Sequence, residues 1–353
     1  MERRTNGRAW CLCLALLALG LPGWARGQQL DAVYESRGTT AYGTIGEITR
    51  TTVTLETNQG KKLYPVNEIR KIAFSGEPGE LRSARDSIPR GQIEDARSAL
   101  EKISMEAVQR KEIRQDIEFL KAFCDGRMAL TGGGDKIAAV RAMVAFVEDA
   151  ANQNSYHYFT GVELLGDLAV ALGRYENAVK YYARLGEAPW PEFQIRASVL
   201  GANALVANRQ FAEAQAKYEQ VLAAGVDDVR AREQKQLATV GRAVCLAETG
   251  KPDEGIVILE AVIAENDSTQ KHELFARTYN ALGVSYVRAG KTQDALLAFL
   301  HVDLMFNQNP DAHAEALYHL STLWRAVNDA DRANRARSLL QSRYSGSPWA
   351  DKK

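Results

Sequence analysis

Histidine serves both as a metal ligand and as a general acid or base, so its spacing is the first test for chemistry in this sequence. The 353 residues include five histidines: His157, His272, His301, His313 and His319. No two of them are four residues apart, the spacing that places two imidazoles of one helix on the same zinc ion. His313 and His319 are six apart, so a helix directs them to different faces. The histidines therefore indicate neither a metal site nor a catalytic base.

Glycine-rich loops can hold phosphate groups, and one segment of this sequence, Thr131 to Lys136, is rich in glycine. A phosphate-binding loop follows a strand and ends in Gly-Lys-Ser or Gly-Lys-Thr. This segment follows a helical pattern and ends differently, so we expect Gly132 to end one helix and Asp135 to cap the next. Nucleophile-elbow, paired-cysteine and calcium-loop motifs are also missing. The sequence predicts no catalytic residue, no cofactor site and no metal site.

The first 27 residues have the pattern of a secretory signal peptide. Three arginines precede an apolar stretch from Trp10 to Leu21, and the small residues Ala25 and Gly27 occupy the two positions that signal peptidase recognises. We expect cleavage before Gln28. The apolar stretch is shorter than the ~20 residues that cross a bilayer, and no later segment is long enough. The pattern predicts an exported protein, periplasmic or extracellular, without a stable membrane span after cleavage.

The charge of the chain is close to neutral. The sequence has 44 basic and 44 acidic residues, and loss of residues 1–27 leaves 40 basic and 43 acidic residues. A protein that binds nucleic acid or an anionic membrane surface normally carries a marked excess of Lys and Arg. We therefore expect no nucleic-acid partner.

Residues 28–79 have the pattern of short β-strands. Apolar and polar residues alternate from Thr52 to Glu56, the period of a half-buried strand, and Asn58 to Gly60 is a turn that closes a hairpin. Pro65 cannot donate a backbone hydrogen bond, which favours an edge strand. About five such strands predict a small β-barrel, and their order resembles the Sm-like and SH3-like barrels of some bacterial envelope proteins. Six basic and six acidic residues leave this segment without the positive surplus that RNA binding requires.

Residues 80–345 change to helical spacing, with apolar residues three and four positions apart, and the pattern repeats. In every repeat but the last, a small residue is followed four positions later by an apolar one. The small residues are Ala96, Ala139, Ala178, Ala214, Gly255, Ala295 and Ala333. Successive members are 36 to 43 positions apart, which fits one helix pair with its loops. The spacing predicts about seven helix pairs, followed by a C-terminal tail at 346–353.

The sixth repeat shows the pattern most clearly. Leu282, Gly283 and Tyr286 lie on its first helix, and Ala295 and Phe299 lie on its second. Small residues at the crossing let the two helices approach, and the large ones fill the space beside the contact. This spacing resembles that of the tetratricopeptide repeat family. The resemblance implies a mainly α fold, in which a tetratricopeptide-like α-solenoid follows the small barrel.

In tetratricopeptide proteins, partners bind in the concave groove that the first helices form. The resemblance therefore implies a protein or peptide partner, and an interaction scaffold without catalytic activity. The segment from Tyr344 to Ala350 resembles the ends of repeats in bacterial envelope-assembly proteins, which favours a role in envelope assembly or maintenance. The identity of the partner and the oligomeric state stay open. The partner-binding positions carried over to this sequence are Arg196, Asn203, Arg277, Asn280, Arg288, Tyr318 and Arg325.

Two other classes of function fit the sequence less well than a scaffold does. A module for cell-wall polymers or glycans would need aromatic platforms, but Trp190, Trp324 and Trp349 are scattered through the chain. An enzyme with a site between barrel and solenoid would need clustered ionisable groups with shifted pKa values, and no motif marks such a cluster. We expect a non-enzymatic scaffold and keep glycan binding as the alternative.

Overall fold

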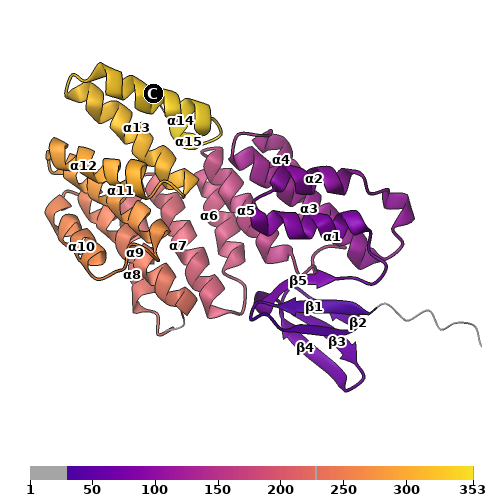
Figure 1. Cartoon of the computed structure of the whole chain (residues 1–353). Coiled ribbons are helices and arrows are strands. Elements are labelled where there is room, and N and C mark those ends of the chain that lie inside the picture. The colour runs from indigo at the N-terminus through magenta and orange to yellow at the C-terminus, as the bar shows by residue number, and fades with distance from the viewer. Residues whose placement is uncertain (1–29, 227–228, 353) are drawn as a thin grey trace, which may run out of the picture.

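The computed structural model describes residues 30–226 and 229–352. The expected signal peptide, residues 1–27, lies outside this part of the chain. A five-stranded sheet comes first and helices follow it (Figure 1). Among the described residues, no helix is both long enough and apolar enough to span a membrane. The strands are β1 (Asp31–Glu35), β2 (Thr40–Ile48), β3 (Thr52–Thr57), β4 (Gly60–Pro65) and β5 (Ile69–Ala73).

The strands pair antiparallel in the order β4-β3-β2-β1-β5. On β3 the apolar residues Val53 and Leu55 are buried, as their alternation with polar residues predicts. Val53 pairs with Tyr64 across the predicted hairpin, which places both side chains in the core of the sheet. Pro65 ends the edge strand β4, in agreement with its missing backbone N–H.

The predicted closed barrel is wrong, because β4 and β5 are the two edges of the sheet and do not pair with each other. A closed barrel buries its apolar face against itself. Here Val33, Leu55 and Ile72 instead share one buried cluster with Leu81 and Leu100 of the first two helices. These two helices cover the apolar face that closure into a barrel would otherwise bury, so the sheet stays open.

Seven helix pairs follow, which confirms the predicted solenoid. A short additional helix, α15 (Pro348–Asp351), lies in the predicted C-terminal tail and contacts α13 and α14. The pairs are α1 (Gly79–Ser87) with α2 (Ile93–Glu101), α3 (Lys111–Leu130) with α4 (Lys136–Glu148), α5 (Tyr158–Ala171) with α6 (Tyr175–Leu185), α7 (Pro191–Ala207) with α8 (Phe211–Ala223), α9 (Val229–Glu248) with α10 (Pro252–Ala264), α11 (His272–Arg288) with α12 (Thr292–Met305), and α13 (Pro310–Ala326) with α14 (Ala330–Arg343).

The small residues of the repeat pattern lie where the helices cross, and all seven are buried. In the sixth pair, a Cβ added to Gly283 would lie 2.5 Å from Cζ of Phe299, so the aromatic ring occupies the space that a side chain would need. Gly166 meets Tyr182 in the same way. Gly290 ends α11 with φ of +72°, the left-handed conformation expected for a glycine after a helix. The spacing seen in the sequence is therefore a packing requirement.

A buried polar network ties the sheet to the first repeats. Asp116 on α3 accepts hydrogen bonds from Arg85 Nε of α1 at 2.6 Å and from the Tyr156 hydroxyl at 2.7 Å. His157 Nε2 lies 2.5 Å from Asp116 Oδ1, the oxygen that also accepts the Tyr156 hydrogen bond. Arg85 also donates to Glu77, the residue that leads from the sheet into α1, at 2.6 Å. The network joins four segments, so it holds the sheet in one position against the solenoid.

Candidate partner-binding groove

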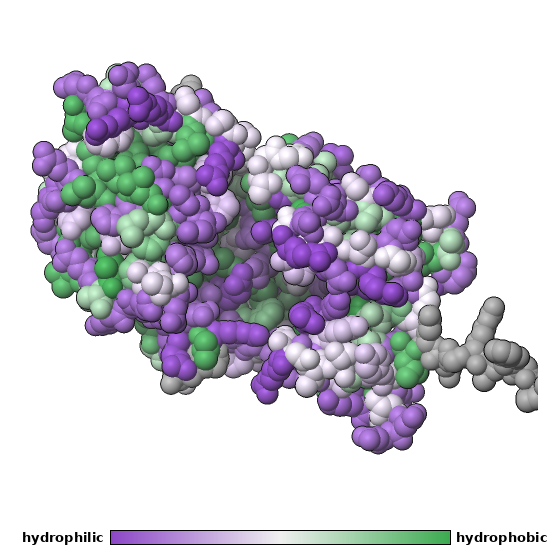
Figure 2. All heavy atoms as spheres, in the orientation of Figure 1, coloured by the Kyte–Doolittle hydropathy of each residue, from purple (hydrophilic) through white to green (hydrophobic). Residues whose placement is uncertain are grey.

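The first helices of consecutive pairs face a common hollow. Contacts between successive first helices join α3 to α5, α7 to α9, α9 to α11 and α11 to α13, and no second helix contacts the next second helix as closely in the described chain. Closer spacing on one side curves the solenoid, with the first helices on the concave side. Figure 2 shows the hollow in the middle of the face in view, between the N-terminal and C-terminal helices, with hydrophilic residues on its walls.

Two predicted partner-binding arginines connect neighbouring first helices. Arg196 on α7 forms a bidentate ion pair with Glu163 on α5, with Nη2 at 2.5 Å and Nε at 3.1 Å from Oε1. Burial opposes the charge of Arg196, but the hydrogen bond that Arg196 donates to Glu163 and the charges of nearby carboxylates together outweigh burial, so the pKa of Arg196 is raised. Arg288 on α11 pairs with Glu248 on α9 at 2.7 Å in the same manner. Both guanidinium groups already hold a carboxylate of this chain.

Two further predicted residues also have partners within the solenoid. Arg277 pairs with Glu273 one turn earlier on α11, at 3.1 Å. Asn280 is 2% exposed, and its amide Nδ2 donates to the Ala312 carbonyl at 2.8 Å and to Glu315 at 3.1 Å. Asn280 therefore connects α11 to α13, and its side chain lies in the interface between these helices.

The remaining three predicted residues differ in which side-chain groups they leave available to a partner. Tyr318 is half-buried, and its ring centroid lies 5.4 Å from that of Trp349. Asn203 is exposed on α7 and accepts a hydrogen bond from the Tyr218 hydroxyl at 2.6 Å, which leaves its NH2 group available. Arg325 is exposed on α13 and has no ion pair with any residue in the described ranges. Asn203 and Arg325 thus offer free hydrogen-bond donors at two of the predicted positions.

One groove residue was missed from the sequence. Asp167 lies on α5 one turn after Glu163 and accepts a hydrogen bond from the Tyr182 hydroxyl at 2.8 Å. Burial, together with the nearby charge of Glu163, raises the pKa of Asp167 to about 6. The four-residue spacing of two acidic side chains on a predicted first helix was a signal that could have identified it. The groove therefore contains a carboxyl group that titrates close to neutral pH.

Asp167→Asn should stabilise the protein more at pH 8 than at pH 4. The ordinary pKa of 3.8 is raised to about 6 in the fold, so the folded state retains a proton that the unfolded state has lost. The contribution of this group to the free energy of unfolding therefore falls as the pH rises from 3.8 through 6. Asparagine keeps the acceptor for Tyr182 but cannot ionise. Urea denaturation at both pH values should show a difference of at least ~1 kcal/mol, and equal effects at both would contradict the assignment.

The buried network at the junction of sheet and solenoid was also missed from the sequence. Arg85, Asp116 and His157 come from separate parts of the chain, so no local motif marks them. Asp116 is 1% exposed, and its carboxylate oxygens are occupied by Arg85, Tyr156 and His157. These groups have shifted pKa values, as an active site would, but they are buried and bonded to one another. Their arrangement stabilises the fold.

The tryptophans considered for glycan binding do not form a common platform. Trp190 packs against Phe193 at a centroid distance of 5.1 Å, and Trp349 packs against Tyr318. Trp324 lies on α13, and none of the ring contacts of the described chain joins it to the other two. The three tryptophan rings therefore do not form one aromatic surface.

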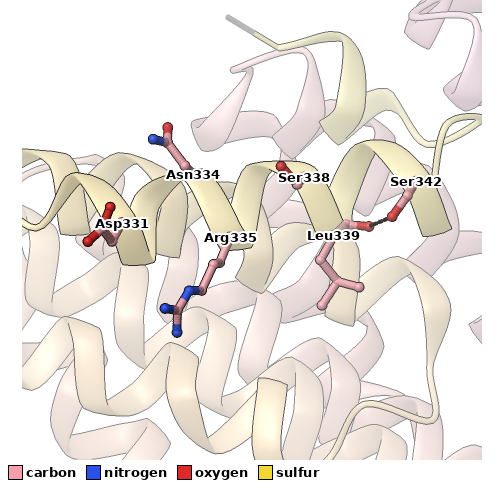
Figure 3. Close-up of a pocket in the computed structure, with 6 residues that line it drawn as sticks. All are labelled: Asp331, Asn334, Arg335, Ser338, Leu339 and Ser342. Atoms are coloured by element: carbon pink, nitrogen blue, oxygen red, sulfur yellow. Dashed lines mark hydrogen bonds between the residues drawn. The ribbon is translucent and has the colours of Figure 1, made fainter.

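A hollow of about 700 Å³ lies along the outer side of α14, outside the groove (Figure 3). All of its lining residues belong to this one helix, so the hollow is open to solvent. In Figure 3, Arg335 and Leu339 point to one side of the helix, and Asn334 points away from it. The lining contains no predicted partner-binding residue. It consists of Asp331, Asn334, Arg335, Ser338, Leu339 and Ser342.

Comparison with known proteins identifies the repeats. Two family models, both described as tetratricopeptide repeat, match residues 163–194 and 199–271. A tetratricopeptide repeat protein from Parabacteroides merdae ATCC 43184 aligns with a TM-score of 0.53 and 18% identity over 75% of this chain and 91% of that one. A Rap protein complexed with competence and sporulation factor aligns with a TM-score of 0.53 and 11% identity over 77% of this chain and 76% of that one. No curated protein matches by sequence.

Proposed function

We propose that this chain is an exported interaction scaffold that binds a linear segment of a protein or peptide partner in the concave groove of its tetratricopeptide solenoid. The observation that carries the proposal is the groove itself, which follows from the contacts between successive first helices and appears as a hollow with hydrophilic residues among those on its walls. The Rap protein with a similar solenoid was solved in complex with competence and sporulation factor, which supports binding as the mode of action. The scaffold acts by shape and hydrogen bonding, without catalysis.

The arginines indicate the chemistry of the partner. Arg196, Arg277 and Arg288 each hold a glutamate of this chain, so a partner carboxylate would have to displace that glutamate. Arg325 holds none among the described residues and can form a charge-assisted hydrogen bond at no such cost. The partner segment therefore carries a carboxylate that reaches Arg325.

Arg325→Ala should weaken partner binding strongly and leave the protein folded. Interface arginines often cost ~2 kcal/mol or more on truncation, whereas an exposed charge contributes little to stability. The partner would be captured from an envelope fraction with residues 28–353 as bait, and its affinity measured by calorimetry. Arg335→Ala, on the outer side of α14, is the matched control and should leave the affinity unchanged. If both variants bind as well as the unaltered chain, the groove is not the binding surface.

Export and an envelope role belong to the same proposal. Residues 1–27 have the composition and order of a signal peptide, and the charge of the remaining chain is near neutral. Resemblance of the Tyr344–Ala350 segment to envelope-assembly repeats supports assembly or maintenance of the envelope as the process. The partner then meets the groove outside the cytoplasm.

A further inference from the structure

Two loops that are far apart in the sequence meet across the solenoid. Gly132 lies between α3 and α4, and Gly346 lies between α14 and α15. A Cβ added to Gly346 would lie 2.4 Å from the backbone nitrogen of Gly132 and 2.6 Å from its Cα. The two backbones are thus so close that only glycine fits at position 346. In Figure 1 the end of α14 lies beside the N-terminal repeats, in agreement with this contact.

The turn that carries Gly346 is held firmly by its own repeat. The Tyr344 hydroxyl and His313 Nδ1 share a hydrogen bond of 2.7 Å, and His313 Nε2 is hydrogen-bonded to Asp303 at 2.8 Å. On the other side of the turn, Arg337 Nη2 donates to the Ala350 carbonyl at 3.0 Å. The turn is therefore pressed against the α3–α4 loop as a fixed support.

We infer that the contact of Gly132 with Gly346 is a latch that closes the groove from the side, so that the groove accepts a partner segment with a free chain end. This inference rests on the proposed function, because it concerns which partners the same groove admits. The contact joins the second and seventh helix pairs, and the pairs between them complete a closed ring around the groove. A segment between two folded domains cannot enter a closed ring, whereas a free chain end can thread into it.

Access to the groove can be measured without any partner. Residues 28–353 contain two cysteines, Cys124 and Cys245. Both are buried, and burial raises the pKa of each thiol to about 12, so neither should react with maleimides near neutral pH. Asn203→Cys places one reactive thiol on the groove wall, two helical turns after Arg196. Asn334→Cys is the control, because this position is exposed on the outer side of α14.

With the latch closed, N-ethylmaleimide should label both introduced cysteines, but a polyethylene-glycol maleimide of several kilodaltons should label position 203 several-fold more slowly than position 334. Gly346→Ala should abolish this difference, because its methyl group has no space beside Gly132. Gly201→Ala is the matched control, since a Cβ there meets nothing within 4 Å. Tyr344→Phe weakens the support of the turn without adding an atom to the contact, so it opens the latch even if Gly346→Ala misfolds.

Equal labelling of positions 203 and 334 by the large reagent in the unaltered background would overturn the latch. The same conclusion would follow if neither Gly346→Ala nor Tyr344→Phe changed the rate at position 203. The labelling result does not depend on the Arg325 experiment. The groove can therefore bind its partner without a latch, or be latched and bind nothing, and the two experiments distinguish these cases.

Discussion

Asp116→Ala should destabilise the N-terminal half of the protein by ~3–5 kcal/mol, the range observed when one member of a buried ion pair is removed. Burial alone would raise the pKa of Asp116, but the charge of Arg85 and the hydrogen bond from His157 lower it to about 2. The carboxylate is therefore ionised and compensates a guanidinium that is almost as deeply buried. Alanine would leave Arg85, Tyr156 and His157 without their common acceptor.

The matched control lies on the same helix. Asp125 of α3 pairs with Arg97 at 2.6 Å, but both side chains are partly exposed to solvent. Asp125→Ala should therefore cost ~0–1 kcal/mol, as is usual for surface ion pairs. Urea denaturation gives the free energies, and hydrogen exchange shows where protection is lost. For Asp116→Ala the loss should concentrate in the sheet and in α1 to α5. Similar costs for both variants would mean that the buried network contributes no more than a surface pair.

Gly283→Ala should destabilise the sixth helix pair, although alanine favours helices more than glycine does. A Cβ at position 283 would lie 2.5 Å from Cζ of Phe299 and 2.6 Å from its Cε2. Phe299 is fully buried, so its ring can move only by disturbing its neighbours. Overpacking of this kind typically costs ~1–3 kcal/mol.

Gly201→Ala, at a comparable site, should stabilise the protein instead of destabilising it. Gly201 also lies within a first helix, and a Cβ there would meet nothing within 4 Å. The substitution should stabilise α7 by up to ~1 kcal/mol, the difference in helix propensity between the two residues. Because each repeat contacts only its neighbours, hydrogen exchange should locate the effect of Gly283→Ala in the fifth to seventh pairs. A uniform loss of protection across the sheet and all repeats would contradict the solenoid description.

Much of the fold followed from short-range patterns. Ala295 and Phe299 mark a helix crossing because a close approach requires a small residue with a large one beside it. Gly290 marks a helix end because its left-handed conformation strains other residues, and Asp135 caps the next helix by accepting a hydrogen bond from the Ile137 backbone at 2.8 Å. Such rules involve neighbours within one or two turns, so the sequence displays them directly.

The packing partner of the sheet could not be predicted from such local patterns. Alternation at Val53 and Leu55 indicated which face of β3 is buried, but not what covers it. A barrel and an open sheet on a helical support bury the same side chains, so the local pattern cannot distinguish them. The contact of the sheet with Leu81 and Leu100 distinguishes the open sheet from a barrel, and this contact joins residues far apart in the chain.

For the candidate site, the sequence by itself determined the residue type at each repeat position that the family resemblance predicts to bind a partner. Only the tertiary structure decided which of these side chains are available. Arg288 and Arg325 occupy similar predicted roles, yet Arg288 is paired with Glu248 of the preceding first helix and Arg325 is free among the described residues. The same holds for the contact of Gly132 with Gly346. Pairing and closure depend on distances between different repeats, and those distances are set by how the helices pack.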